Sequence, residues 1–502
     1  MSVDPIRSVA IVGGGTAGWM TAASLAQFFP RLRGSIRLIE SAEIGTVGVG
    51  EATIPPIIEF LRTLGLDENE VIRRTQATFK LGIEFKDWTR PGHSYIHPFG
   101  PIGTPKRGVP FATYWRKCLE TGTAAPLETY SLAAVAARQA RFMRPVRQPG
   151  SPLETITYAL HLDAGLFAAY LREHAEARGV IRTEGKVRGV ALQAESGFIE
   201  SITLESGERI EADLYIDCTG FRGLLIEGAL ASGYEDWTRW LPCDRAVAVG
   251  CERSGPLSSH TLARAREVGW QWRIPLQHRV GNGYVYSSQL VKDEVAQDLL
   301  LSSLEGRALR EPLRLKFTTG RRRLCWNRNC VAIGLSAGFL EPLESTGIHL
   351  IQRGIFLLLT FFPDRQFRPP DIDRYNRQLA FDYEGARDFL IAHYRLTERP
   401  GEFWRHCRDT GMPDSLAERL ELFRSHGRIL RDDREIFTVQ GWQAILAGQD
   451  LRPTGYDPMA DSLSGEQVQR AVDEVRRVIA NCAAAMPLHQ EFIAQHCAAP
   501  AP

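Results

Sequence analysis

The sequence of 502 residues lacks an excess of charge of either sign. It carries 60 basic and 59 acidic residues, so its formal net charge at pH 7 is +1. A chain without a strong electrostatic field has no general attraction for nucleic acid or for an anionic membrane surface. The balance of charge therefore predicts no nucleic-acid partner and favours a small molecule as the ligand.

Long apolar runs are also missing. The longest, IFLLLTFF at residues 355–362, is far shorter than the roughly 20 residues that cross a bilayer. The N-terminal MSVDPIRSVAIVGGG does not have the basic start, apolar run and cleavage site of an export signal. We therefore expect a soluble, cytoplasmic protein with no membrane partner.

Cysteines at metal-ligand spacing are absent. Nine cysteines are scattered without a CxxC pair, and Cys325 and Cys330 lack the second pair that a zinc site needs. We expect reduced thiols that mostly fill core positions, and no metal. A length of 502 residues, with 44% hydrophobic and 24% charged residues, is typical of a soluble protein with two or more modules.

The chain does contain a glycine-rich turn near its N-terminus. Residues 9–12 predict a buried strand and residues 16–29 a helix, and between them Gly13, Gly15 and Gly18 have GxGxxG spacing. Gly13 permits the tight turn, Gly15 lets the backbone approach a pyrophosphate, and Gly18 lets the helix pack closely on the strand.

This strand, turn and helix predict a dinucleotide site. A diphosphate would bind the amides at the helix start, which include those of Thr16 and Ala17. A second strand, SIRLIE, ends in Glu40, about 20 residues on, where a carboxylate holds a ribose hydroxyl. The alternative is a glycine turn in an α/β domain that binds no nucleotide.

A second GxGxxG is missing, which bears on the choice between FAD and NAD. LYIDCTGFRG (residues 214–223) and CVAIGLSAGFLEPLESTGIHL (residues 330–350) each look like a strand that runs into a glycine turn. This order resembles the FAD monooxygenases, in which two such segments close the flavin site. The resemblance implies FAD, with Gly334 and Leu340 in the site. Because no NADPH domain is found, a separate NAD(P)H-dependent flavin reductase is expected to supply reduced FAD.

The order of these segments predicts a discontinuous α/β fold. The assignment is a Rossmann-type FAD module at residues 1–90, 155–225 and 315–365, a β-sheet substrate-side module at 91–154 and 226–314, and a mainly helical C-terminal region at 366–502 that completes the substrate pocket. The local expectations are an ordered loop at residues 90–115, a helix at 158–179 and a β-meander at 186–220.

Four motifs together resemble the flavin-dependent halogenases, the family that includes the tryptophan halogenases. They are the glycine fingerprint, GWxWxIP at residues 269–275, and the segments around Lys80 and Glu344. The resemblance covers most of the chain and implies an FAD-dependent monooxygenase-like fold. It assigns His97 and Phe99, in YIHPFG, to the substrate side. It assigns VGVGEATIPP to a flavin strap that includes Gly48, Val49, Gly50, Glu51 and Ala52.

The family's chemistry implies a role for each segment. Reduced FAD reacts with O2 to give a flavin hydroperoxide, a halide attacks its distal oxygen, and the hypohalous acid formed passes to a lysine beside an aromatic substrate. Lys80 matches that lysine. Glu344 matches the second essential residue, which orients the halogenating species and accepts the ring proton. The amides of Thr346 and Gly347 match the halide site, as exposed helix-start amides can.

Taken alone, Lys80 has another interpretation. In TFKLGIEF it alternates with Phe79 and Leu81, which indicates a strand with one apolar face and a solvated lysine on the other. An ordinary lysine pKa of about 10.4 leaves roughly 1 amine in 2500 neutral at pH 7. We therefore prefer an ammonium that hydrogen-bonds hypohalous acid over a covalent haloamine, which would need a large fall in the pKa.

Glu344 and the tryptophans also have plain alternatives. Glu344 precedes a helix expected near Gly347, with Ser345 or Thr346 as its cap, and a carboxylate is favourable there in any protein. Trp270 and Trp272 share one side of a strand that Pro275 ends. Together with Ile274, they either fill a core or form the wall that the resemblance implies between flavin and substrate.

The resemblance weakens where the tryptophan halogenases bind the amino acid's charged groups. That region has no Tyr-Tyr pair and no glutamate between Glu435 and Glu466, although Trp442 is available to stack on a ring. We therefore expect an indole-type or larger electron-rich aromatic as substrate rather than free tryptophan. Chloride or bromide is the halide. The oligomeric state stays open, with a homodimer as one option. The alternatives are a flavin-dependent aromatic hydroxylase and a flavin-binding protein without catalysis.

Overall fold

The computed structural model describes residues 4–43 and 50–500, so the predicted strap residues Gly48 and Val49 lie outside the described residues. The chain divides into two compact units. The first comprises residues 1–76, 162–238 and 317–384, and the second comprises residues 77–161, 239–316 and 385–502. Which ligands the three predicted modules bind stays a prediction.

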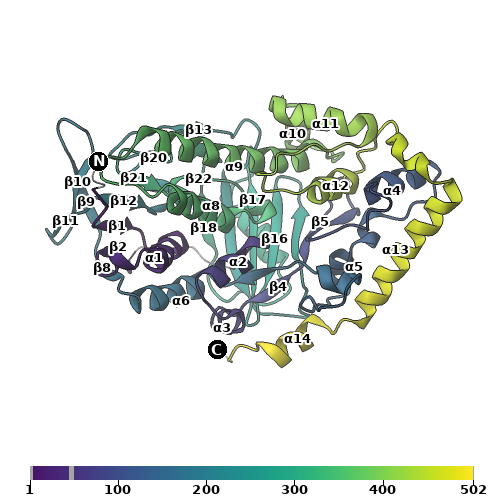
Figure 1. The fold of residues 1–502 in the computed structure, drawn as a ribbon, viewed down its shortest axis with the longest axis horizontal. Helices are drawn as coiled ribbons and strands as arrows, with labels where there is room; N and C mark the ends of the chain where they lie inside the picture. The colour runs from purple at the N-terminus through teal and green to yellow at the C-terminus, as the bar shows by residue number, and fades with distance from the viewer. Residues whose placement is uncertain (1–3, 44–49, 501–502) are drawn as a thin grey trace. The chain divides into compact units, whose positions relative to one another are not determined.

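A parallel sheet forms the centre of the first unit (Figure 1). Its order is β20-β21-β12-β1-β2-β8, and only the edge strand β20 runs antiparallel to its neighbour. The strands are β1 (Val9–Val12), β2 (Ile36–Glu40), β8 (Ile181–Glu184), β12 (Leu214–Asp217), β20 (Trp326–Asn327) and β21 (Cys330–Ala332). Strand β1 is buried along its whole length, as an apolar run in a covered parallel sheet should be.

Helices α1 (Thr16–Phe28), α6 (Ala164–Glu176) and α8 (Gly347–Thr360) accompany this sheet, and α1 packs against both α6 and α8. The predicted strand, turn and helix at the N-terminus are confirmed. The helix predicted over residues 158–179 is wrong in its first part, because β7 (Ala159–Leu162) occupies that segment. Asp163 then caps α6 by accepting hydrogen bonds from the amides of Gly165 and Leu166.

Smaller elements complete the first unit. The predicted meander is confirmed as an antiparallel sheet of β9 (Val187–Leu192), β10 (Ile199–Leu204) and β11 (Arg209–Glu211). The others are β3 (Glu51–Ala52), β13 (Tyr234–Asp236), β19 (Gly320–Arg322), β22 (Gly338–Phe339), α2 (Pro56–Thr63) and α3 (Glu68–Arg74).

A seven-stranded sheet with the order β18-β14-β17-β16-β15-β5-β6 forms the second unit's framework. Its pairs are antiparallel except for β15 with β5. The strands are β5 (Gly82–Lys86), β6 (Ser94–Pro98), β14 (Arg245–Cys251), β15 (Thr261–Ala265), β16 (Trp270–Pro275), β17 (Val280–Tyr286) and β18 (Leu313–Lys316). Strand β4 (Thr78–Lys80) pairs antiparallel with β7.

Helices dominate the C-terminal part, as predicted. They are α9 (Pro369–Arg395), α10 (Glu402–Asp409), α11 (Asp414–His426), α12 (Val439–Gly448), α13 (Gly465–Ala485) and α14 (His489–His496). Earlier in the chain lie α4 (Phe111–Glu120), α5 (Leu132–Arg138) and α7 (Asp293–Ser302). The loop predicted at residues 90–115 is wrong in part, because β6 and the start of α4 lie within it. Core residues of α4 and α13, among them Trp115 and Val472, pack into one apolar cluster.

The cysteines and the apolar segments have the environments that the sequence predicts. All nine cysteines are free thiols, and seven of them are buried. No helix in the described part of the chain is both long enough and apolar enough to cross a membrane.

Two buried histidines predict acid lability. Burial lowers the pKa of His349 and of His489 from 6.5 to about 4. Below pH 6.5 the unfolded chain binds protons that the folded chain refuses, so the free energy of unfolding falls as the pH drops from 6.5 toward 4. Each histidine contributes at most about 1.4 kcal/mol per pH unit.

We expect His489→Gln to flatten this fall relative to the wild type, as measured by urea unfolding between pH 7 and 5. Parallel curves for the two proteins would show that His489 takes up its proton equally in both states, which contradicts the prediction.

Candidate functional site

The glycine turn of the first unit brings three backbone segments together. A Cβ on Gly13, where φ is 113°, would lie 2.2 Å from the carbonyl oxygen of Cys218, at the end of β12. A Cβ on Gly18 would lie 1.9 Å from the carbonyl oxygen of Gly13. Only glycine fits at such approaches, so strand, helix and turn pack as a dinucleotide fingerprint requires.

Open space lies beside this packed turn. A Cβ on Gly15 would meet nothing within 4 Å. Helix α1 has neither a side-chain cap nor an acidic residue in its first turn, so the amides near Thr16 and Ala17 face no competing acceptor from a cap. Gly334 of the third segment packs close to the same helix start, because a Cβ on Gly334 would lie 2.7 Å from the Cβ of Ala17. These residues fit the diphosphate of FAD.

Glu40 lies at the edge of the same turn. Its carboxylate accepts hydrogen bonds from the indole N–H of Trp19 at 3.2 Å and from Nε of Arg182 at 2.5 Å. Each carboxylate oxygen accepts more than one hydrogen bond, so Glu40 retains the capacity to hold a ribose hydroxyl. The arrangement fits the predicted role.

The described part of the strap contains an unusual carboxyl group. Burial raises the pKa of Glu51 to about 7, so its protonated and ionised forms coexist near neutral pH. Its neighbours Gly50 and Ala52 are buried, as is Leu340 in the third predicted FAD segment. The strap contacts to FAD stay predictions.

The segment around Glu344 ends in a helix start. Glu344 is fully buried in a short 3-10 helix (Pro342–Glu344), and α8 begins at Gly347 as predicted. Thr346, one of the two predicted cap residues, occupies the N-cap position but makes no side-chain cap hydrogen bond, and Ser345 before it adopts a left-handed conformation. A Cβ on Gly347 would meet nothing within 4 Å. Space is therefore open beside Gly347 at this helix start, a position where backbone amides can bind an anion.

The burial of Lys80 differs from what the alternating pattern around it predicts. The strand breaks at Leu81 between β4 and β5, and the Lys80 side chain is 0% exposed. Its Nζ lies 5.2 Å from the centre of the Phe99 ring, a distance that suits attraction between an ammonium and an aromatic face. The interpretation of Lys80 as a solvated surface residue is therefore wrong.

A buried chain of hydrogen bonds holds the strand of Lys80. The hydroxyl of Thr78 donates to the carbonyl oxygen of Pro275 at 2.7 Å. Nδ1 of His161 must then donate to Thr78 Oγ1, 3.0 Å away, and Nε2 accepts from the Thr261 hydroxyl at 2.9 Å. Burial, followed by the charge of Lys80, lowers the pKa of His161 well below its ordinary value. The Thr78 hydroxyl thus joins β4 to the last residue of GWxWxIP, and the neutral imidazole joins Thr78 to Thr261.

The two tryptophans lie on β16 as predicted, with ring centres 5.9 Å apart. Trp270 also contacts the buried ring of Trp88, at 6.3 Å between centres. Gly283 on β17 lies opposite Trp272, and a Cβ there would be 2.0 Å from the Trp272 ring. Ile274 and Pro275 are buried on the same strand. Trp270 therefore belongs to an aromatic core, and a role for the pair as a wall stays a prediction.

His97, Phe99 and Trp442 belong to one aromatic cluster with two residues that the sequence did not single out. His97 lies on β6 rather than in the predicted loop, and its ring centre is 6.4 Å from that of Phe99. Phe389 of α9 lies 5.5 Å from His97 and 4.7 Å from Trp442. Phe437 stacks on Phe389 at 3.6 Å. No local pattern marks Phe389 within its long helix.

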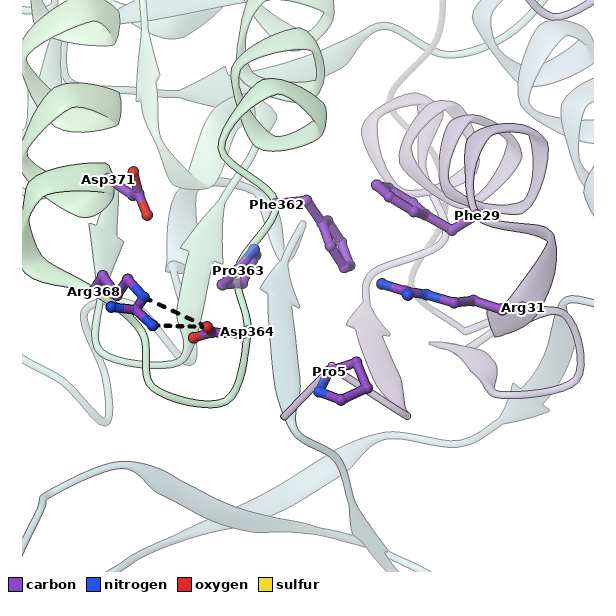
Figure 2. Close-up of a pocket in the computed structure, with 8 residues that line it drawn as sticks. All are labelled: Pro5, Phe29, Arg31, Phe362, Pro363, Asp364, Arg368 and Asp371. Carbon is purple, nitrogen blue, oxygen red and sulfur yellow. Dashed lines mark hydrogen bonds and ion pairs between the residues drawn. The ribbon is translucent and has the colours of Figure 1, made fainter. Parts of the chain in front are cut away.

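A separate pocket lies in the first unit (Figure 2). It has a volume of about 270 Å³. Its lining residues are Pro5, Phe29, Arg31, Phe362, Pro363, Asp364, Arg368 and Asp371. None of the predicted site residues lines it.

Comparison with known proteins identifies the class. A family model described as tryptophan halogenase matches residues 8–465. The structure of Xcc4156, a flavin-dependent halogenase from Xanthomonas campestris, has a TM-score of 0.95 and 46% identity, and the match covers 99% of this chain and 100% of that one. BrvH, a flavin-dependent halogenase from Brevundimonas sp. BAL3, has a TM-score of 0.93 and 47% identity, with 98% and 99% covered.

A curated relative extends the match in sequence. The 7-chloro-L-tryptophan 6-halogenase KtzR from Kutzneria sp. strain 744 is 36% identical over 522 residues, covering 97% of this chain and 98% of KtzR. The protein is therefore a flavin-dependent halogenase, an oxidoreductase of a class that uses FAD, O2 and halide. It belongs to the tryptophan halogenase family, and the predicted fold class is confirmed.

Because space is open at Gly15, a side chain there should weaken FAD binding with little effect on the free energy of unfolding. Gly15→Ala should raise the dissociation constant of FAD about 10-fold or more, because crowding a close contact costs about 1–3 kcal/mol. Its cost to unfolding should stay below about 1 kcal/mol. Gly18→Ala is the control, since its Cβ would meet Gly13 and destabilise the fold. Flavin fluorescence titration and thermal unfolding measure the two quantities. Unchanged FAD affinity in Gly15→Ala would place the diphosphate elsewhere.

Proposed function

We propose that this enzyme uses reduced FAD, O2 and chloride or bromide to halogenate an electron-rich aromatic substrate of the indole type. The family match supports the reaction class. The observation that carries the residue assignment is the complete burial of Lys80 with its Nζ 5.2 Å from the Phe99 ring centre. A fully buried lysine is rare, and this one stands where the family's essential lysine is expected.

The fingerprint residues of the first unit, with Glu40 and the described strap residues, hold the flavin in this proposal. When bound, reduced FAD together with O2 supplies the oxidising power that converts halide into hypohalous acid. The amides of Thr346 and Gly347 hold the halide, because amides at a helix start bind an anion without a formal positive charge. Both halides suit such a site. A separate NAD(P)H-dependent flavin reductase supplies the reduced cofactor.

Lys80 directs the halogen in this proposal. Its ammonium donates a hydrogen bond to the oxygen of hypohalous acid, which makes the halogen more electrophilic. The aromatic carbon attacks the halogen, a carbon–halogen bond forms, the halogen–oxygen bond breaks, and the oxygen leaves as water after taking up a proton. Neutral His161 adds no competing positive charge beside the ammonium.

Glu344 removes the proton in this proposal. The ring carbon that gains the halogen must lose its hydrogen to restore aromaticity, and an ionised carboxylate is a suitable acceptor. Glu344 is fully buried just before α8. It also orients the halogenating species, as the resemblance to the family implies.

The substrate is proposed to be an indole-type aromatic without the free amino acid head group. The region between Glu435 and Glu466, which contains α12, lacks the tyrosine pair and glutamate expected for that head group.

Mass spectrometry with a panel of indoles and phenols tests this function. The purified enzyme receives FAD, a flavin reductase and NADH, with bromide, with chloride, or with neither. We expect products that carry the isotope pattern of the halide supplied and that are absent without halide. Addition of one oxygen regardless of halide would contradict halogenation and favour an aromatic hydroxylase. Efficient turnover of free L-tryptophan would contradict the proposed substrate class.

A further inference from the structure

Arg419 and Trp442 form a close pair beside the aromatic cluster of the second unit. Arg419 lies on α11 and Trp442 on α12. The guanidinium carbon of Arg419 is 4.4 Å from the centre of the Trp442 ring, so the cation lies over the indole face. Trp442 is 2% exposed. The ring of Phe389 meets Trp442 edge to face, at 4.7 Å and 78°.

Each member of this pair carries a buried donor without an acceptor. Within the residues that the structure describes, Trp442 Nε1 and Arg419 Nη1 have no hydrogen-bond partner. Leaving a buried donor unsatisfied costs about 1–3 kcal/mol. Two such donors on side chains that lie against each other are therefore unlike ordinary core residues, and they fit a site that is completed by a ligand.

The charges around Arg419 and Trp442 indicate which kind of group the ligand presents to them. Arg419 Nη2 donates to Glu435 Oε1 at 2.9 Å, and the backbone amide of Asp432 donates to the same carboxylate oxygen at 3.0 Å. Glu435 thus holds Arg419 in place and balances its charge. Trp442 Nε1 and Arg419 Nη1 remain available to a ligand, and both can only donate hydrogen bonds. An oxygen acceptor matches them, whereas an ammonium does not.

We propose that Arg419 and Trp442 bind an oxygen acceptor, a carbonyl or carboxylate, on the side chain of the aromatic substrate. The assignment rests on the proposed function, because it identifies the aromatic cluster of His97, Phe389, Phe437 and Trp442 as the place where the ring binds. It defines the substrate class more closely: an indole-type ring with an acyl, amide or acid substituent and no free amine.

Binding measurements test this site without catalysis. Isothermal titration of the FAD-loaded enzyme compares indole, indole-3-acetamide, indole-3-acetate and tryptamine. In the wild type, the amide and the acid should bind more tightly than indole and tryptamine. Trp442→Phe removes the N–H and keeps an aromatic ring. We expect it to reduce the advantage of the amide over indole roughly 2- to 10-fold, which corresponds to one hydrogen bond.

Two matched comparisons separate ligand binding from folding. Trp115 is also buried, but its Nε1 donates to the carbonyl of Ala125 at 2.9 Å. Both substitutions remove ring volume from the core, but only Trp115→Phe also loses a hydrogen bond, so it should lower the melting temperature of the ligand-free protein more than Trp442→Phe does. Arg419→Lys, which keeps the charge opposite Glu435 but loses the forked donors, should also reduce the advantage of the amide. Arg428→Lys, at the exposed ion pair with Asp457, should not.

Three results would overturn the proposal: failure of the amide and the acid to bind, an unchanged preference in Trp442→Phe, or an equal loss of melting temperature in Trp442→Phe and Trp115→Phe. The last would mean that a buried water or another group already satisfies the N–H. Preferential binding of the amide without any halogenated product would support the binding site and contradict the proposed function.

Discussion

The burial of Lys80 on a short, hydrogen-bonded strand is the constraint on which the second unit's site depends. A buried ammonium is costly unless its surroundings stabilise it. Phe99 offers an aromatic face at 5.2 Å. Burial, followed by the charge of Lys80, lowers the pKa of His161 and keeps it neutral, and Thr78 and Thr261 hold its two ring nitrogens. The same chain of hydrogen bonds ends on the carbonyl of Pro275. It therefore ties the strand of Lys80 to the last residue of the GWxWxIP strand.

A different constraint governs the first unit, where the site is defined by how closely backbones approach. The contacts at Gly13 and Gly18 leave no room for a side chain, whereas the space beside Gly15 is open. The turn is therefore tightly packed at Gly13 and Gly18 and open at Gly15, where the diphosphate is expected. A second helix start, at Gly347, has the same open character. In the proposed function, backbone amides bind the diphosphate at one helix start and the halide at the other.

Much of the first unit could be predicted because its signals are local. The glycine spacing, the buried strand and Glu40 all lie within one stretch of sequence, and the structure has them as expected. The alternation around Lys80 could not reveal its environment, because a period of two identifies opposite faces of a strand but not what covers them. Tertiary packing decided that both faces are buried.

Other errors have similar causes. Proline and glycine in residues 90–115 indicated a loop, yet pairing with β5 makes His97 part of a strand. Thr346 is a residue type that commonly caps helices and it occupies the N-cap position, but it follows the left-handed Ser345 and makes no side-chain cap hydrogen bond. Phe389, Phe437 and Arg419 come from segments far apart in the sequence, and only the fold brings them to Trp442.

In the proposed mechanism, the Lys80 ammonium hydrogen-bonds hypohalous acid and directs its halogen to the substrate. A single turnover of Lys80→Met tests it most directly, with pre-reduced FAD, O2, bromide and indole. Stopped-flow absorbance follows flavin oxidation, and mass spectrometry follows the product. We predict that flavin is oxidised in the variant as in the wild type while brominated indole is lost. Formation of brominated indole at the wild-type yield would contradict the assignment of Lys80.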